Sequence, residues 1–549
     1  MAIGSAPRAP ARRPGPSPWT CLAVGIAALL AIPIASVVSS LAVPAGEVWF
    51  HLWRTQLLGL VGRTLALLLG VGAGALIVGG GLAWLVVHHR FPGRAVLEWA
   101  LILPLAVPAY VIGFAFVGLF EYSGPVQSAL RRGLGAGVGL PEIRSYPGVV
   151  VMMTLVFYPY VYLLARVAFR EQGAAEVETA RTLGRSRTAA FLQVTVPMAR
   201  PALVAGVALA MMEALADFGT VATFGYRTLT EAIYRVWYGM FDRIAAAQLA
   251  SVLLLFAAGL LLLERRSRGR ARFAQSSRRG PVIEAVRLSG WRAAGATAAC
   301  LTVLGLAFLL PVGQLAWWAI AAIRAGQVAP DFAALLWHTG ALAGTTAGVA
   351  SLLAVLLAYA GRLHGTAVVR MAAQLASMGY ALPGAVIAVG VLLPLAWADH
   401  ALVPSLERAL GRPLGLLLTG SAAGLVLAYV VRFLAVGLQT VDASLGKIPP
   451  SLDDAARVLG ARAGSALRRV HLPLMRGGLL TALVLVFVET MKEMPATLLL
   501  RPVGVNTLAV EIWERTSEAM WPEAAVPALT LVGVGLLPVV LLIRLTSRR

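Results

Sequence analysis

The sequence predicts an all-α polytopic membrane protein with about twelve transmembrane helices, arranged as two parallel six-helix repeats. Two observations lead to this prediction. Of the 549 residues, 59% are apolar and only 13% are charged, with a mean hydropathy of +0.80, which does not suit a water-soluble surface. A polar, basic segment from Glu178 to Pro197 also returns with the same internal spacing from Asp454 to Pro473, close to half the chain length further on.

The repeated segment keeps an acidic residue, small residues, a glycine and a proline at fixed positions. These are Glu178, Ala180, Gly184 and Pro197 in the first copy, and Asp454, Ala455, Ala456, Gly460 and Pro473 in the second. Glycine permits a tight turn between two short helices, and proline can start the next membrane helix. Each copy should form a rigid knob whose small side chains let another protein approach. The alternative is a pair of ordinary solvated loops, but unconstrained loops drift in length.

Residues 1–263 form the first predicted repeat, with its knob at 171–197. Its expected spans run about Thr20 to Val43, Thr64 to Val87, Leu97 to Phe120, Val149 to Phe169, Pro201 to Phe224 and Ala246 to Leu263. Spans of about 20 residues cross ~30 Å of hydrocarbon. The first span could instead be a cleaved signal peptide, because Val43-Pro44-Ala45 is a passable cleavage site. Its length, and a counterpart in mid-chain, favour a membrane helix.

Residues 264–292 form a short basic linker that needs no fold of its own, and residues 293–549 form the second repeat, with its knob at 444–473. Its expected spans run about Ala293 to Ile320, Thr339 to Ala360, Met371 to Trp397, Ser421 to Leu438, Gly477 to Leu500 and Ala524 to Leu545. Because each repeat has an even number of spans, both knobs should face the same side of the membrane. The repeats are then related by an axis along the membrane normal.

The net charge of +21 comes from 46 basic and 25 acidic residues. In a soluble chain this excess would suggest nucleic acid. Here the arginines crowd alternate segments between the spans, which are cytoplasmic loops by the positive-inside rule. Both termini and the linker are therefore expected in the cytoplasm. Cys21 and Cys300 lie far apart in apolar stretches, so neither a disulfide framework nor a cysteine metal site is expected.

Carboxylates inside apolar spans are expensive and mark a pathway or an ion pair. Glu213 and Asp217 are spaced i and i+4, which predicts one helix face. Glu489 and Glu493 repeat them at the offset that separates the two knob glycines. Symmetric acidic faces near a two-fold axis suit a path for cations, with at most a transient metal site. The alternative is internal pairing that only holds the bundle together, such as Glu489 with Lys492.

At these positions the sequence resembles the permease subunits of ATP-binding-cassette importers. Their hallmark loop reads E-A-A, three residues, G, nine residues, I, one residue, L-P. The departures here are Thr179 for Ala, Val194 and Val470 for Ile, Val196 for Leu, and Asp454 for Glu. Within the family the chain looks most like fused two-repeat iron(III) permeases. The resembling stretches are Tyr158 to Tyr162, Arg200 to Ala202, Glu213 to Val221, Ile233 to Trp237 and Lys492 to Pro502.

The resemblance implies a type I importer permease fold in a bacterial inner membrane. The knobs would then be coupling helices seated in two cytoplasmic ATPase subunits, and a periplasmic or lipid-anchored binding protein would deliver the cargo. No GxxxxGK[ST] pattern occurs, so the chain is not expected to be an enzyme or to bind a cofactor, and ATP and Mg belong to the partner ATPase.

The resemblance leaves the cargo open. Ferric iron is the first expectation, and the alternatives are thiamine, sulfate, a polyamine or a phosphonate. A secondary transporter is a further alternative, but it would not need matched knobs. The aromatic segments from Tyr226 to Asp242 and from Asn506 to Trp521 should lie at the outer interface, as a membrane belt or as part of the surface for the binding protein.

Overall fold

The computed structural model describes residues 17–44, 46–135, 137–172, 180, 182–271 and 285–547. Eleven of the described helices are long and apolar enough to cross a membrane, or up to twelve if one sharply bent pair counts as a single span. The predicted all-helical membrane fold is confirmed. Among the residues singled out from the sequence, Glu178 and Thr179 lie outside the described residues. The tail before residue 17 and residues 272–284 of the linker also lie outside them.

Sixteen helical segments make up the described part of the first repeat. They are α1 (Pro18–Ser39), η1 (Ser40–Ala42), α2 (Glu47–Thr55), α3 (Leu57–His88), α4 (Arg94–Ala100), η2 (Leu103–Ala106), α5 (Ala109–Phe120), α6 (Pro125–Leu134), α7 (Tyr146–Glu171), α9 (Arg187–Ala190), η3 (Phe191–Thr195), α10 (Val196–Ala216), α11 (Gly219–Thr223), α12 (Leu229–Tyr234), η4 (Arg235–Gly239) and α13 (Arg243–Ala271).

The second repeat follows the same plan from α14 onward. Its segments are α14 (Gly290–Leu304), η5 (Gly305–Leu309), α15 (Leu310–Arg324), α16 (Phe332–Leu363), α17 (Ala367–Ala376), η6 (Met378–Ala381), α18 (Gly384–Leu410), α19 (Ala422–Leu445), α20 (Ser451–Val458), α21 (Ala463–Ala466), η7 (Leu467–His471), α22 (Leu472–Leu474), α23 (Arg476–Met491), α24 (Pro495–Leu500), α25 (Leu508–Ser517) and α26 (Trp521–Ser547).

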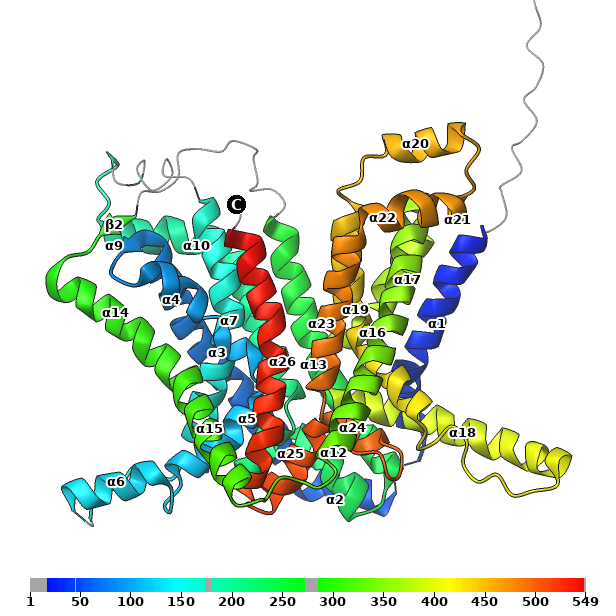
Figure 1. The fold of residues 1–549 in the computed structure, drawn as a ribbon, viewed down its shortest axis with the longest axis horizontal. Helices are drawn as coiled ribbons and strands as arrows, with labels where there is room; N and C mark the ends of the chain where they lie inside the picture. Colours follow the sequence, from blue (N-terminus) through cyan, green and yellow to red (C-terminus); the bar gives the residue numbers. More distant parts are fainter. Residues whose placement is uncertain are drawn as a thin grey trace, which may run out of the picture.

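The two repeats interlock through their first helices. Helix α1 packs against α16, α17 and α18 of the second repeat, and α14 and α15 pack against α4 and α5 of the first. Figure 1 shows the exchange, with α1 beside α16 and α17 on one flank and α14 on the other. At Gly390 in α18 an added Cβ would lie 2.4 Å from the carbonyl oxygen of Pro33, so glycine allows α1 this close approach.

The end of the linker is attached to the first repeat. Strand β1 (His89–Arg90), in the loop after α3, pairs in parallel with β2 (Val286–Arg287). The backbone N–H of Leu288 then donates to the carbonyl of Arg90 at 2.9 Å. The linker was expected to have no fold of its own, and in its last residues that expectation is wrong, because these backbone hydrogen bonds fix it beside the first repeat.

The third predicted span of each repeat is interrupted. The stretch from Leu97 to Phe120 divides into α4, η2 and α5, and the stretch from Met371 to Trp397 divides into α17, η6 and α18. Pro108 and Pro383 stand at the N-caps of α5 and α18. Proline lacks an N–H and restricts the residue before it, so a helix ends before it and a new one starts after it.

The span that follows each knob is also interrupted, at equivalent places. In the predicted span from Pro201 to Phe224, helix α10 ends at Ala216. In the predicted span from Gly477 to Leu500, helix α23 ends at Met491. Short helices α11 and α24 follow each break. Periodic apolar sequence alone predicted continuous helices here, and the breaks are where the buried acids lie.

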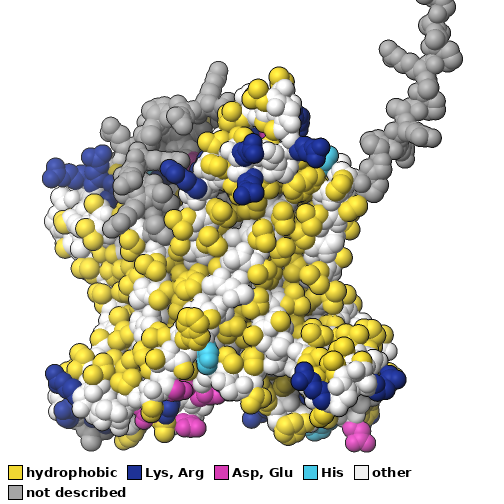
Figure 2. All heavy atoms as spheres, turned by 45° about the vertical axis from the view of Figure 1, so that its right-hand side comes forward, with side chains coloured by type: hydrophobic (Ala, Val, Ile, Leu, Met, Phe, Trp, Pro, Cys, Tyr) yellow, Lys and Arg dark blue, Asp and Glu magenta, His cyan; other side chains and the backbone are white. Residues whose placement is uncertain are grey.

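Both knobs lie at the same end of the bundle, as the parallel repeats predict. Figure 1 shows α9 and α20 to α22 at one end, together with the last turns of α26, while α6, α12, α25 and the outer part of α18 lie at the other. A broad band of hydrophobic side chains separates the two ends in Figure 2. Such a band is expected of a surface that faces lipid rather than water.

Candidate functional site

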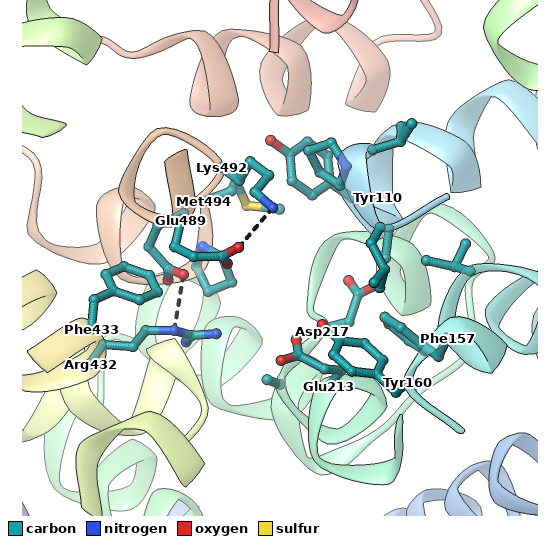
Figure 3. A pocket seen from close by; sticks show the side chains of 18 of the residues that line it. Tyr110, Phe157, Tyr160, Glu213, Asp217, Arg432, Phe433, Glu489, Lys492 and Met494 are labelled. Carbon is teal, nitrogen blue, oxygen red and sulfur yellow. Dashed lines mark hydrogen bonds and ion pairs between the residues drawn. The ribbon is translucent and has the colours of Figure 1, made fainter. Parts of the chain in front are cut away.

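The breaks in α10 and α23 face each other across a central cavity of about 120 Å³. All four acids that the sequence singled out line it, namely Glu213, Asp217, Glu489 and Glu493. Figure 3 shows Glu213 and Asp217 on one side of the cavity and the charged side chains from the end of α23 on the other. The structure therefore brings the two symmetric acid pairs into one site.

The second acid of each pair caps the short helix after the break. Asp217 accepts from the backbone N–H of Thr220 at 2.9 Å, and Glu493 accepts from that of Ala496 at 3.0 Å. The first N–H groups of a helix have no partner within it, and inside a membrane no bulk water replaces one. The prediction that each pair shares one helix face is wrong, because α10 ends before Asp217 and α23 before Glu493.

Among the described residues that line the cavity, the cations come from the second repeat alone. The Nε of Arg432, on α19, lies 3.2 Å from Glu493, and the Nζ of Lys492 lies 3.0 Å from Glu489. The predicted alternative of internal pairing is thus found for these two acids. Among the described residues, Glu213 and Asp217 form no ion pair.

Glu213, which forms no ion pair among the described residues, faces phenol groups. The hydroxyls of Tyr160 and Tyr380 interact with its carboxylate. A third cavity tyrosine, Tyr110, is only 8% exposed, and its hydroxyl has no hydrogen-bond partner among the described residues. The part of the cavity around Glu213 therefore presents carboxylate oxygens and, at Tyr110, a phenol hydroxyl without a partner among the described residues.

The aromatic segments predicted for the outer interface close the cavity toward the end opposite α20. Tyr234 and Trp237 are buried rather than in a membrane belt. The hydroxyl of Tyr234 donates to Pro495 in the other repeat, and its ring stacks on Phe218 with centroids 3.8 Å apart. Beyond this aromatic contact lies a second cavity of about 680 Å³, lined by residues of both repeats. Phe241 in these segments is exposed, and for such exposed side chains the interfacial belt stays a prediction.

The knobs contain the turn that their glycines predicted. Gly184 and Gly460 have φ of +82° and +78°, in the left-handed region that favours glycine. Pro197 lies in the first turn of α10 as predicted, but Pro473 lies in α22, and the membrane helix α23 starts only at Arg476 after an 80° bend.

The small residues of the knobs are less accessible than expected. Ala180 and Ala456 are buried within the chain, and only Ala455 is exposed. Asp454 is also exposed and is 3.5 Å from Arg457. The leucines immediately before the glycines project instead, with Leu183 78% and Leu459 86% exposed.

Comparison with known proteins assigns the chain to a family. The sequence profile described as "Binding-protein-dependent transport system inner membrane component" matches residues 66–267 and again residues 350–549. The chain belongs to this family. An Fe(3+)-transport system permease protein of Haemophilus influenzae is 26% identical over 502 residues, which cover 89% of this chain and 90% of the relative.

Some relatives match about a third of the chain. A sulfate transport system permease protein of Escherichia coli is 34% identical over 187 residues, or 33% of this chain and 65% of the relative. A molybdenum transport system permease protein of Escherichia coli is 29% identical over 188 residues, or 33% of this chain and 78% of the relative. A crystal structure of a bacterial ABC transporter involved in import of the acidic polysaccharide alginate aligns with 15% identity and a TM-score of 0.33, covering 44% of this chain and 89% of that one.

Two features of this permease were missed from its sequence. Arg432 lies inside the predicted span from Ser421 to Leu438, and the rule that flagged the buried acids would also have flagged it. The exposed leucines Leu183 and Leu459 also occupy equivalent places immediately before each glycine, a signal that the repeated spacing already contained.

A polar network fixes the second knob of the permease to α16. Arg362 donates from Nε to Asp453 at 2.8 Å and from Nη1 to the carbonyl of Leu445 at 2.7 Å. Nε2 of the fully buried His471 lies 2.8 Å from Asp453. Burial raises the pKa of Asp453, but the hydrogen bond and charge of Arg362 outweigh burial and hold it below its usual range.

The first knob cannot form this network, because the corresponding residues are Val87, Val177 and Thr195. Among the described residues, the charged network of Arg362, Asp453 and His471 is therefore a feature of the second knob.

Proposed function

We propose that this permease forms the membrane path of an ATP-driven, binding-protein-dependent importer for ferric iron. The observation that supports this cargo is the central cavity, where four carboxylates meet only two cations. The relative that aligns with 89% of this chain is also named as a permease for Fe(3+) transport. The cavity residues Glu213, Asp217, Glu489 and Glu493 would form a weak, transient site rather than a tight one.

The charge balance favours a cation over an oxyanion. Arg432 and Lys492 balance the formal charges of Glu493 and Glu489. The formal charges of Glu213 and Asp217 remain, so the cavity is formally negative. Two unit charges about 4 Å apart have an interaction energy of about 4 kcal/mol at an effective dielectric constant near 20. The negative carboxylates therefore repel sulfate or molybdate and attract a cation. Among the described residues, no three His, Cys, Asp or Glu side chains are grouped to hold a metal, which suits passage rather than storage.

The knobs would couple transport by this chain to ATP hydrolysis in its partners. Each would seat in one of two cytoplasmic ATPase subunits, with Leu183 and Leu459 as apolar tips and Gly184 and Gly460 as the turns that present them. ATP and Mg would be bound by those partner chains, and this chain would carry no catalytic residue or cofactor. A periplasmic or lipid-anchored binding protein would deliver the cargo at the opposite end.

To test the cargo, the permease would be reconstituted with its ATPase and binding protein in proteoliposomes. We expect ATP-dependent uptake of radioactive ferric iron, and no uptake of sulfate or molybdate. Uptake of an oxyanion without iron uptake would overturn the proposed cargo, and iron uptake driven by an ion gradient without ATP would favour a secondary transporter.

The proposed orientation places both termini, the linker and both knobs in the cytoplasm of a bacterial inner membrane. It rests on the arginines between alternate spans. After residue 275, we expect a fused reporter that works only in the cytoplasm to be active and one that works only in the periplasm to be inactive. Activity of a periplasmic reporter at this position would contradict the orientation, and a fusion after residue 122, before α6, serves as the periplasmic control.

A further inference from the structure

The cavity is symmetric in its acids but not in its cations. Glu213 and Asp217 correspond to Glu489 and Glu493 at the offset that separates the two knob glycines. At the same offset, however, Arg432 corresponds to Val156 and Lys492 to Ala216. All of these residues line the cavity.

The first repeat shows that the helix break does not need the cations. Asp217 caps α11 with valine and alanine at the two equivalent positions. If the break required a buried ion pair, the first repeat would need one too. Arg432 and Lys492 therefore have a role other than building the cap, and an ion pair of this kind is in any case weak evidence for stability.

The cations do not exhaust the bonding capacity of the cavity. Arg432 reaches Glu493 through Nε, while its buried Nη1 has no hydrogen-bond partner among the described residues. The buried hydroxyl of Tyr110 likewise has none. A buried polar group without a partner costs free energy, so these groups indicate a site that a ligand fills or that rearranges when one passes. Figure 3 shows Arg432 on the side of the cavity opposite Glu213 and Asp217.

We infer that Arg432 and Lys492 are tethered counter-ions, which occupy Glu493 and Glu489 and thereby keep the cavity's affinity for a multivalent cation low. The cargo is left with Glu213, Asp217 and the three phenols that line the cavity. This inference rests on the proposed cation path and adds what sets its affinity. Carboxylate and phenol oxygens suit a hard cation, and two fixed positive charges beside it repel that cation and speed its release.

Terbium(III) is a suitable probe, because tyrosine sensitises its luminescence and Tyr110, Tyr160 and Tyr380 belong to or face the cavity. The full-length permease in lipid nanodiscs would be titrated with terbium. The test variant, Arg432→Val with Lys492→Ala, places the first-repeat residues at both positions. We expect it to bind terbium at least about tenfold more tightly than the wild type, since two repelling charges are removed. It should also import iron more slowly in the reconstituted importer.

Unchanged or weaker terbium binding by the double variant would overturn the inference. So would sulfate binding to the wild type that the double variant loses, because the two cations would then form an anion site. Lys492→Ala alone is the second variant, for the case that the double variant does not fold. It should tighten binding by a smaller factor, and no tightening in it would also overturn the inference.

Failure of the underlying cation path gives a different result. The variant Glu213→Gln with Glu489→Gln should lose the tyrosine-sensitised terbium signal. If that signal is the same in this variant and the wild type, the cavity is not a cation path and the proposed function fails. If the signal is lost there but the counter-ion variants bind no more tightly, the path stands and only the counter-ion role is wrong.

Discussion

Replacing Glu213 and Glu489 together by glutamine should reduce iron uptake at least about tenfold, while the amount of protein and its association with the ATPase stay normal. Glutamine keeps the shape and much of the hydrogen bonding of glutamate and removes its charge. One charge at about 4 Å from a cation contributes about 4 kcal/mol at an effective dielectric constant near 20, so even part of that loss exceeds tenfold in rate. The measurement is uptake of radioactive iron by membranes that contain equal amounts of each protein.

These two acids are the informative ones, because Asp217 and Glu493 also cap helices and their loss would disturb the fold. The matched control is Glu121→Gln, at a carboxylate that lies outside the cavity and 3.6 Å from Arg144. It should leave uptake unchanged. Normal uptake in the double variant, or failure of that variant to accumulate, would favour a purely structural role for the acids.

Replacing Gly460 or Gly184 by valine should reduce both transport and ATPase association, with the protein still inserted. Neither site is crowded, since an added Cβ would meet nothing within 4 Å. The effect comes from the backbone, because φ of +78° and +82° is strained for a β-branched residue by about 1–3 kcal/mol. The loop would relieve that strain by turning Leu459 or Leu183 away from the partner, and we expect a loss of about tenfold or more.

The same loop offers its own control. Gly464 lies in α21, is exposed, and has no positive φ, so Gly464→Val should be tolerated. Gly460→Asn should retain part of the activity, because asparagine enters the left-handed region more readily than valine. Wild-type ATPase association and transport in both valine variants would refute the coupling role of the knobs.

The sequence predicted the repeats, the helical membrane fold and the acids of the cavity, because each leaves a local or periodic signal. It did not predict the breaks at Ala216 and Met491, since the apolar pattern continues through them and only tertiary packing supports the capped short helices. The exchange of α1 and α14 between repeats leaves no such signal either. Hydropathy cannot tell which apolar helix a span will pack against.

The candidate site was predicted in its charges but not in its partners. The spacing of Glu213 and Glu489 located the acids, while Arg432 and Tyr110 reach the cavity from spans far away in the sequence. At the second knob, Asp454 was chosen from the spacing, but its neighbour Asp453 makes the contacts with Arg362 and His471. Two adjacent aspartates are equivalent in sequence, and only the direction of the helix decides which one faces inward.

We infer that the path at the helix breaks and the coupling at the knobs are separate parts of one importer. ATP hydrolysis and iron uptake, measured together in the same proteoliposomes, distinguish these two parts. We predict that Glu213→Gln with Glu489→Gln keeps the ATPase activity stimulated by the binding protein but loses uptake, whereas Gly460→Val loses both. Equal loss of the two activities in both variants, or uptake that continues without the cavity carboxylates, would contradict the claim.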